Sequence, residues 1–374
     1  MKILHTSDLH LGISLCGVPL LPYQKEFCKT LCTLSEQADA VIISGDIFDT
    51  SVASADAVKC WSELATSLCL DRKIPVIVCA GNHDGAARLS SCSDLLKAAG
   101  LYISGSFEDV FTPVIVGDAA VYSLPYFNPA DAAAVLDCKS TAAAVMKAAA
   151  EKILSEADRS KCNILAAHCF AAGGSPAESD ISARAAQSVG GADFVSLDAF
   201  KGFDYVALGH LHKAQTVSKD GTAIRYSGAP LPYSFGEARY EKTVTMFDTV
   251  SREITEIPVP QPYTLRTVED SYENILAAAE DDKNRDDFMK ITLTDRYAGD
   301  NAFMRLKELY PNLLHFSGKT SEAAGEASVT AKEAAELDIV SLAARYSEER
   351  RGYPPDEDER AWLAEALKET DEEE

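Results

Sequence analysis

The chain opens with KILHTSDLHLG at residues 2–12, where a mostly apolar run passes directly into Asp8 and His10. A short apolar run of this kind is typical of a strand buried on both faces of a sheet. Proteins that alternate strands and helices place their functional residues just beyond the carboxyl ends of such strands. The opening stretch therefore predicts a buried first strand at residues 2–6 with a polar site at its end.

The same arrangement recurs four times along the chain. Apolar runs at residues 41–44, 75–79, 163–167 and 205–208 predict further buried strands. Each run leads into a polar cluster, and these clusters are Gly45-Asp46-Ile47-Phe48-Asp49, Gly81-Asn82-His83-Asp84, Ala167-His168 and Gly209-His210-Leu211-His212. A glycine before a cluster allows the backbone to turn tightly. We therefore expect the clusters to meet at one edge of the sheet structure.

Helical periodicity between these strands predicts the covering layers of an α/β sandwich. The predicted helices span residues 24–37, 54–70, 89–99 and 141–157. After Lys213 the pattern changes to short alternating runs, which predict a more antiparallel sheet closing the sandwich. These later strands span residues 214–217, 223–226, 242–248 and 253–258.

The proline-rich stretch PVPQP at residues 258–262 predicts a domain boundary. Residues 1–260 would form the large domain and residues 263–320 a small α+β domain. The small domain would contain helices at 271–279 and 302–309 and strands at 289–294 and 313–316. Residues 321–374 would form a flexible hinge and then an acidic helical segment that binds a partner, with helices at 334–346 and 359–367.

The amino-acid composition excludes several classes of protein. The 374 residues are 47% hydrophobic and 25% charged, which excludes a disordered chain, a collagen-like repeat and a disulfide-stapled miniprotein. The formal net charge of −23 argues against attraction of the whole surface to nucleic acid or to anionic membranes. It leaves open a local basic groove or contact with phosphates through metal ions.

The sequence predicts a cytoplasmic protein. Its longest apolar stretches are too short to span a bilayer, and we expect no signal peptide, because the first residues lead straight into a polar motif. Its ten cysteines include no CxxC pair, so we expect reduced, mostly buried thiols in a cytoplasmic protein rather than disulfides or a zinc site.

The five clusters together predict a transition-metal site, because histidines and carboxylates at the ends of neighbouring strands are the donors that such ions require. Asp8-x-His10 would place two ligands on one ion, and His210-x-His212 could send its imidazoles to two different ions. Any one cluster alone would be read as ordinary structure. The occurrence of all five clusters, each directly after a predicted strand, is what supports a metal site over ordinary structure.

The order D-x-H, G-D-x-x-D, G-N-H-D, H and G-H-x-H resembles the signature of the calcineurin-like metallophosphoesterases. That resemblance implies a four-layer α/β sandwich that holds two divalent ions. Asp46 would bridge both ions. The remaining ligands would divide between them, Asp8, His10 and His212 for one and Asn82, His168 and His210 for the other.

The same resemblance implies roles for the remaining cluster residues. His83 would contact the scissile phosphate and assist the leaving oxygen, and Asp84 would orient His83 by accepting from its other ring nitrogen. Asp49 would either hydrogen-bond a ligand histidine or end the strand. Arg88 would either contact substrate phosphate or form a structural salt bridge.

A narrower resemblance, to the nuclease subunits of bacterial SbcCD complexes, rests on longer matches. They are His5-Thr6-Ser7-Asp8-Leu9-His10-Leu11-Gly12, residues 45–49, residues 188–193, residues 203–212 and residues 225–237. It implies a manganese-dependent exonuclease and endonuclease, with Mg²⁺ also possible, that acts on DNA ends and hairpins in repair and recombination. It also implies a cap at residues 263–320 that helps to select DNA structure.

The resemblance implies partners as well. They are an SbcC-type ABC ATPase with long coiled coils, bound through residues 334–367, and a second copy of the chain, packed through helices 54–70 and 89–99. The whole would be a heterotetramer without membrane contact. The alternative for residues 334–367 is a helix that folds back on its own small domain.

DNA binding by the chain alone would be weak, because counterion release requires lysine and arginine close to phosphates. The candidate cations are Lys201, Lys213, Lys219, Arg225 and Arg239. Two other functions stay open at this point. One is a small-molecule phosphodiesterase or protein phosphatase of the same superfamily, and the other is a non-catalytic scaffold for the ATPase.

Overall fold

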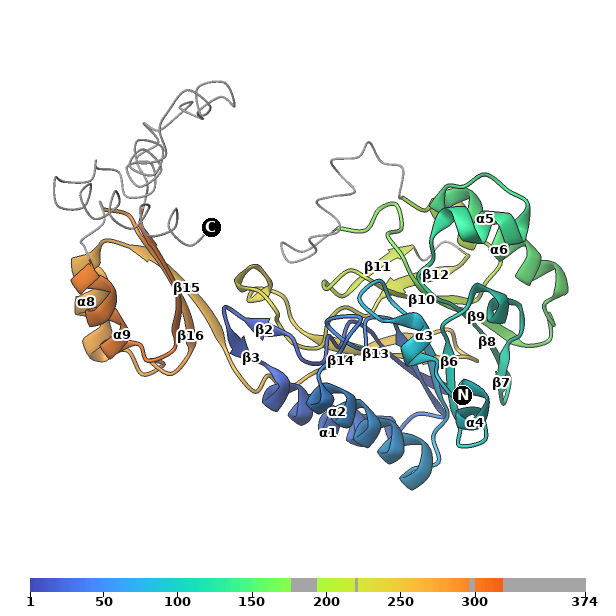
Figure 1. Cartoon of the computed structure of the whole chain (residues 1–374), viewed down its shortest axis with the longest axis horizontal. Coiled ribbons are helices and arrows are strands. Elements are labelled where there is room, and N and C mark those ends of the chain that lie inside the picture. The colour runs from blue at the N-terminus through green and yellow to red at the C-terminus, as the bar shows by residue number, and fades with distance from the viewer. Residues whose placement is uncertain (176–193, 219–220, 296–299, 319–374) are drawn as a thin grey trace, which may run out of the picture. The chain divides into compact units, whose positions relative to one another are not determined.

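The structure is a computed structural model that describes residues 1–175, 194–218, 221–295 and 300–318 (Figure 1). The chain divides into two compact units, Met1–Thr264 and Leu265–Glu374. The segment 321–374 with its expected partner helices, the motif at residues 188–193 and Lys219 lie outside the described residues.

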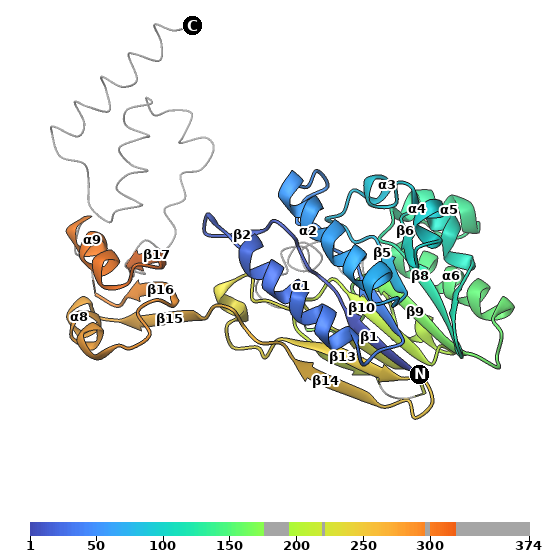
Figure 2. The ribbon, with the colours of Figure 1, turned by 90° about the horizontal axis from the view of Figure 1, so that it is seen from below.

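The first sheet of the large unit has six strands in the order β14-β13-β1-β4-β5-β6. Strands β1, β4, β5 and β6 run parallel, and β13 pairs with β1 in the antiparallel direction. Figure 2 shows the central strands of this sheet beneath the blue helices. The bounds are β1 (Lys2–Thr6), β4 (Ala40–Ser44), β5 (Val76–Cys79), β6 (Leu101–Ser104), β13 (Thr243–Asp248) and β14 (Ile254–Pro258).

The second sheet also has six strands, in the order β11-β12-β10-β9-β8-β7. Its central strands run parallel, and only the edge strands β11 and β7 are antiparallel to their neighbours. The bounds are β7 (Val114–Val116), β8 (Ala119–Leu124), β9 (Cys162–His168), β10 (Tyr205–Gly209), β11 (Gln215–Ser218) and β12 (Ala223–Tyr226).

The expectation of one antiparallel sheet after Lys213 is wrong. Strands β11 and β12 extend the second sheet, and β12 lies parallel to β10. Strands β13 and β14 return to the first sheet and cover the free edge of β1. The strands exist where predicted, but β13 pairs with the first strand of the chain, and local patterns carry no information on so distant a pairing.

The two sheets pack face to face around an apolar core. One sheet contributes Ile3, Ile42 and Ile77, and the other contributes Ile164 and Ala207, all fully buried. The rings of Tyr205 and Phe247 stack across this core with their centroids 4.3 Å apart. Burying each large apolar side chain contributes about 1.5–3 kcal/mol, so this layer is a main source of stability.

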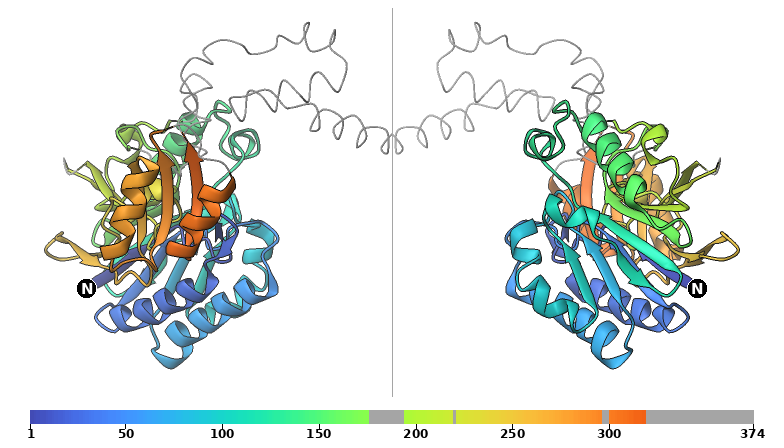
Figure 3. Two further views of the ribbon diagram at one scale, coloured as in Figure 1. Left: turned by 90° about the vertical axis from the view of Figure 1, so that its left-hand side faces the viewer. Right: turned by 90° about the vertical axis from the view of Figure 1, so that its right-hand side faces the viewer.

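Helices cover the outer face of each sheet (Figure 3). Helices α1 (Leu21–Ser35) and α2 (Ala55–Thr66) lie along the first sheet, while α5 (Pro129–Leu136) and α6 (Ala142–Glu156) cover the second. The small side chains of Ala149 and Ala150 allow α6 to pack closely on the strands. The predicted four-layer α/β class is therefore confirmed.

One predicted helix is wrong. Residues 89–99 do not form one helix but belong to two short ones, α3 (Ala86–Leu89) and α4 (Ser93–Lys97). Cys92 between them has a positive φ of 61°, which an α-helix does not allow. The Ser90 hydroxyl donates to the carbonyl of Ala86 and caps the first helix locally. This segment is therefore a weaker candidate for a long docking helix than α2, whose N-cap is Ser54, the first residue of the predicted range 54–70.

The second unit has a three-stranded parallel sheet in the order β15-β16-β17. Two helices connect the strands and bury Ile275 and Leu306 against Ile291. Strand β15 was not predicted, because it follows the prolines directly and its side chains are largely exposed. The bounds are β15 (Leu265–Asp270), α8 (Tyr272–Asp281), β16 (Phe288–Leu293), α9 (Asp300–Leu309) and β17 (Leu313–Gly318).

Two further findings bear on the sequence analysis. All ten cysteines lie in the described residues, none forms a disulfide, and six are buried. Within the described ranges, no helix is both long and apolar enough to cross a membrane.

Candidate metal centre

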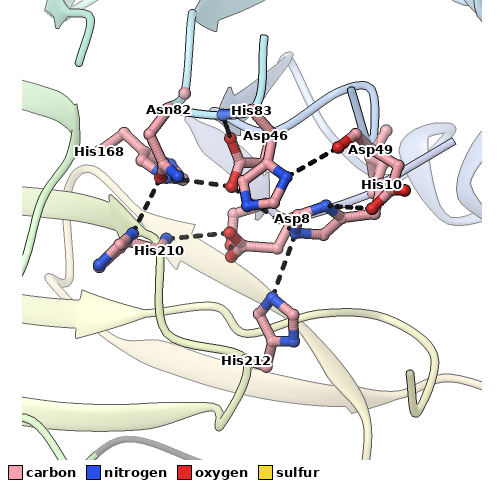
Figure 4. A network of polar contacts seen from close by, with 12 residues as sticks. Asp8, His10, Asp46, Asp49, Asn82, His83, His168, His210 and His212 are labelled. Carbon is pink, nitrogen blue, oxygen red and sulfur yellow. Dashed lines mark hydrogen bonds and ion pairs between the residues drawn. The ribbon is translucent and has the colours of Figure 1, made fainter. Parts of the chain in front are cut away.

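The polar clusters meet at one edge of the sandwich, where strands from both sheets end (Figure 4). Strands β1, β4 and β5 approach from the first sheet, and β9 and β10 approach from the second. Hydrogen bonds join the sheets at this edge. The Ser44 hydroxyl donates to the carbonyl of Ala207 over 2.8 Å, and His168 Nδ1 donates to the carbonyl of Ser44 over 2.9 Å.

The backbone is strained at this edge. Asp8, His10, Asp46 and His210 have positive φ values of 54°, 42°, 53° and 100°. Residues other than glycine avoid this region, and each such residue costs roughly 1–3 kcal/mol. Strain of this kind persists where the surrounding structure enforces it, which is most often at functional sites. Here the positive φ values direct these four side chains toward a common centre.

Glycines make room for this crowding. Gly45 has a φ of 86°, and a Cβ there would lie 2.2 Å from His168 Nδ1. Gly209 does not need a positive φ, but its Cβ would lie 1.8 Å from the carbonyl oxygen of Ser44. The turn-forming role expected of these glycines therefore applies to Gly45. Gly209 is required because the two sheets touch there.

One group of ligand atoms comes from Asp8, His10 and His212, which are buried and lie within 4.8 Å of one another. The Nε2 atoms of His10 and His212 face each other at 3.2 Å. Two imidazole nitrogens at this distance can share one hydrogen, or their lone pairs can meet on one cation.

A second group comes from Asn82, His168 and His210. The amide oxygen Oδ1 of Asn82 lies 2.9 Å from His168 Nε2 and 3.1 Å from His210 Nδ1. Asn82 and the two histidines come from different strands and from both sheets. Their convergence is therefore a product of the fold and not of local sequence.

Asp46 lies between the two groups. Its Oδ2 is 3.6 Å from His10 Nε2 and 3.3 Å from His168 Nε2, and its Oδ1 accepts from the backbone N–H of His83 at 2.9 Å. Asp46 also forms a close group of possible ligands with Asp8 and His168. A single buried carboxylate thus touches one imidazole of each group.

These residues fit a pair of divalent ions. Ligand atoms about 2.1 Å from one ion lie about 3–3.5 Å from each other, which is close to the separations seen here. The donor set of imidazole nitrogens, carboxylates and an amide oxygen suits first-row transition ions. The outward nitrogens of His168 and His212 are hydrogen-bonded to acceptors, as is typical of metal-binding histidines.

The electrostatics of the centre favour a cation. Burial raises the pKa of Asp46, but the imidazoles of His168, His10 and His83 outweigh it and hold that pKa well below its usual range. Burial lowers the pKa of His168, but the Asp46 carboxylate outweighs it and raises the pKa to about 9. Burial, together with the His168 charge, lowers the pKa of His210 to about 3. The Asp46 carboxylate therefore stabilises positive charge at the point where the two groups of candidate ligands meet.

The ring of His83 is held by a backbone carbonyl of the loop after β4 and not by the side chain of Asp84. Nδ1 of His83 donates to the carbonyl of Asp49 over 2.7 Å, and the ring lies edge-on to His10 with the centroids 4.7 Å apart. Because a carbonyl only accepts, Nδ1 carries the hydrogen and Nε2 is left for other contacts.

The predicted hydrogen bond from His83 to Asp84 is wrong. The two oxygens of Asp84 accept from the backbone N–H groups of Ile47, Phe48 and Gly81, at 3.2, 3.0 and 2.8 Å. Burial and the nearby Asp46 charge raise the pKa of Asp84. Asp84 therefore organises the loop after β4, which carries Asp46 and Asp49, and acts on His83 only through that loop.

Asp49 and Arg88 were left open by the sequence. The Oδ1 of Asp49 lies 3.5 Å from His10 Nδ1, so its side chain approaches a candidate ligand histidine without forming the hydrogen bond of the first alternative. Arg88 is exposed, donates to the carbonyl of Ser51 over 2.9 Å and has no carboxylate partner among the described residues. The salt-bridge alternative for Arg88 therefore finds no support.

Sequence reasoning missed two residues behind His212. Glu237 at the end of η4 (Phe235–Glu237) lies 3.2 Å from His212 Nδ1, and its other oxygen pairs with Lys242. Lys242 also donates to the carbonyl of His212 over 3.3 Å. Glu237 is fully buried and Lys242 is 4% exposed. Only their burial identifies them, because a Glu and a Lys five residues apart are usually solvent-exposed.

Comparison with known proteins extends these findings. Residues 1–214 match the family model of the calcineurin-like phosphoesterases. Residues 261–351 match the model described as the type 5 capsule protein repressor C-terminal domain, SbcD_C. The chain is 32% identical over 324 residues to a Staphylococcus epidermidis protein that is named as a subunit of the nuclease SbcCD, and the alignment covers 85% of each chain.

Proposed function

This chain belongs to the calcineurin-like phosphoesterases and, among them, to the nuclease subunits of SbcCD type, and from this premise we propose that it hydrolyses DNA phosphodiester bonds at two divalent metal ions. The observation that carries the proposal is the contact of Asp46 with both groups of candidate ligands. A carboxylate shared by two adjacent ligand sets is the arrangement that a two-metal site requires.

The ligands would divide as their geometry groups them. Asp8, His10 and His212 would hold one ion, Asn82, His168 and His210 would hold the other, and Asp46 would contact both. We propose Mn²⁺ as the ion, with Mg²⁺ as a possible substitute. Imidazole donors favour manganese over magnesium, which prefers oxygen ligands.

When bound, the two ions would neutralise phosphate oxygens and lower the pKa of a water molecule between them. The protein's own residues orient the reaction. The Asp49 carbonyl fixes the hydrogen of His83 on Nδ1, which leaves Nε2 for the substrate. With a second proton on Nε2, His83 would donate it to the departing oxygen, opposite the attacking water.

The substrate and partners are also proposals. We propose that the chain cuts DNA ends and hairpins in the cytoplasm together with an SbcC-type ABC ATPase. The name of the staphylococcal relative, which is one subunit of a nuclease, supports the presence of another. Residues 263–320 would help to select DNA structure, and two copies of the chain would pair through α2, with its partly exposed Val58.

The test is cleavage of a DNA hairpin by the purified chain with Mn²⁺, beside bis-p-nitrophenyl phosphate as a minimal diester. His83→Leu is assayed in parallel, with its metal content measured. We expect hairpin cleavage that disappears in the variant while the metal stays bound. Diester hydrolysis without any DNA cleavage, even after the ATPase is added, would favour a small-molecule phosphodiesterase instead.

A further inference from the structure

Four of the five cations that the sequence offered for phosphate contacts lie in the described residues, and Lys219 does not. Lys201 pairs with Asp198 on the surface. Arg225 is 1% exposed and binds Thr245, Thr216 and Glu256, so it is part of the core and its predicted role in DNA contact is wrong. Lys213 and Arg239 remain. Within the described residues, neither has a carboxylate at ion-pair distance.

Lys213 and Arg239 share one aromatic ring. The Nζ of Lys213 lies 5.1 Å from the centroid of Tyr240, and the guanidinium carbon of Arg239 lies 5.2 Å from the same centroid. Arg239 also donates from Nη2 to the Tyr240 hydroxyl over 3.1 Å. We call these three residues the Tyr240 cluster.

The shared ring holds the two cations in place without neutralising them. Cation–π contact is worth about 0.5–1 kcal/mol at an exposed site, enough to restrict a long side chain. A restricted side chain loses less conformational entropy when it binds an anion. A carboxylate partner would have cancelled the charge, whereas an aromatic ring leaves it available.

The cluster adjoins the metal centre. Lys213 follows the candidate ligand His212 directly, and consecutive Cα atoms are about 3.8 Å apart. On the other side, the backbone N–H of Tyr240 donates to the carbonyl of Glu237 over 2.9 Å, and Glu237 contacts His212. Both connections lead to the same imidazole. Lys213 and Arg239 therefore belong to the two segments that adjoin His212.

We propose that the Tyr240 cluster binds backbone phosphates of the DNA strand that flank the phosphodiester being cut, an inference that rests on the proposed function. A chain with a net charge of −23 does not attract a polyanion through its overall charge, so two restrained cations on segments that adjoin a candidate ligand would select where the strand enters. Phosphate contacts of this kind set the position of the strand and carry no base preference.

The salt dependence of DNA binding tests this inference. Binding of a fluorescent single strand to the full chain is measured by anisotropy in EDTA, which prevents cleavage, over a series of NaCl concentrations. The plot of log affinity against log salt should become shallower by about 0.7 for each phosphate contact removed, so by about 1.4 in Lys213→Ala/Arg239→Ala. Lys201→Ala, which removes a paired surface cation, serves as the matched control and should keep the wild-type slope.

Kinetics with Mn²⁺ give an independent readout. In the double variant, kcat/KM should fall more on a DNA strand than on bis-p-nitrophenyl phosphate, which has no flanking phosphates. Tyr240→Leu should show part of the same loss of kcat/KM on the DNA strand. Tyr240→Phe, which keeps the ring, should retain most of the wild-type kcat/KM.

Two results would overturn the inference. A double variant with the wild-type slope, from a chain that does bind DNA, would show that the strand runs elsewhere while leaving the proposed function standing. A wild-type chain that neither binds nor cuts DNA would overturn the proposed function and this inference together.

Discussion

The carboxylate of Glu237 accepts from Nδ1 of His212 at 3.2 Å, inside the protein and behind the metal centre. Its second oxygen pairs with the buried ammonium of Lys242. Burial raises the pKa of Glu237, but Lys242 and His212 outweigh it and lower that pKa to about 2, so the carboxylate is ionised at neutral pH. The hydrogen bond places the hydrogen of His212 on Nδ1 and turns the lone pair of Nε2 toward His10.

We therefore expect Glu237→Gln to weaken metal binding on the His212 side by about 10- to 100-fold, which is the usual effect of removing such an outer contact. The variant should also lose about 3–5 kcal/mol of stability, because Lys242 is left buried without its counter-charge. Manganese titration followed by electron paramagnetic resonance gives the affinity, and thermal unfolding gives the stability.

The double variant Glu237→Gln/Lys242→Met separates these two effects. It removes the unpaired buried charge, so most of the stability should return while the metal affinity stays low. Recovery of metal affinity in the double variant would contradict a positioning role for Glu237.

Substitutions of Asp46 should distinguish its role as a shared ligand from its strained backbone. Asp46→Asn and Asp46→Ala both remove the carboxylate, so both should reduce the binding of both ions in a manganese titration. Asp46 has a φ of 53°, which asparagine tolerates and alanine does not. Asp46→Ala should therefore be less stable than Asp46→Asn by about 1–2 kcal/mol in denaturant unfolding without metal. Loss of only one ion from Asp46→Asn would rule out a shared ligand.

Asp84→Asn should act on the fold more than on the metals. An amide has one acceptor oxygen where the carboxylate of Asp84 uses two for three N–H donors, so at least one buried N–H loses its partner. The expected loss of stability is about 1–3 kcal/mol. His83→Leu is the matched comparison, since it changes the adjacent residue and removes one hydrogen bond to the Asp49 carbonyl, but leaves the three N–H contacts of Asp84 in place. Equal melting temperatures for Asp84→Asn and the wild type would contradict this role.

His5 should make the metal-free protein sensitive to acid. Burial and the nearby Arg225 charge lower its pKa to about 3, while an unfolded chain titrates near 6.5. Between these values the unfolded state binds a proton that the folded state excludes. The free energy of unfolding should therefore fall as the pH drops below 6.5, by up to about 1.4 kcal/mol per pH unit from this group.

Urea unfolding of the wild type and His5→Gln at several pH values from about 7 to about 4, in EDTA, tests this sign. The stability difference between the two proteins should shrink or reverse toward low pH. A difference that stays constant with pH would show that His5 is not the group responsible.

The positions of the candidate ligands at strand ends can be derived from the sequence alone, whereas their assignment to two ions came from the family resemblance. An apolar run and the polar residues directly after it are neighbours in the chain, so local pattern places Asp8, Asp46, Asn82, His168 and His210 at strand ends. Parallel strands end on one side of a sheet, so the clusters meet once the layers form. The layer class and the ligand positions follow from this rule.

Other features depend on contacts between segments that are distant in sequence, and only the tertiary structure decides them. β13 pairs with β1 from far along the chain, and that pairing buries Arg225 against Thr245. Whether Asp84 faces His83 or a loop 37 residues earlier depends on how β4 and β5 lie side by side. The burial of Glu237 behind His212 likewise requires both sheets to be assembled. Local periodicity reflects how side chains are spaced along a single helix or strand. Hydrogen bonds and burial between elements are instead determined by packing in three dimensions.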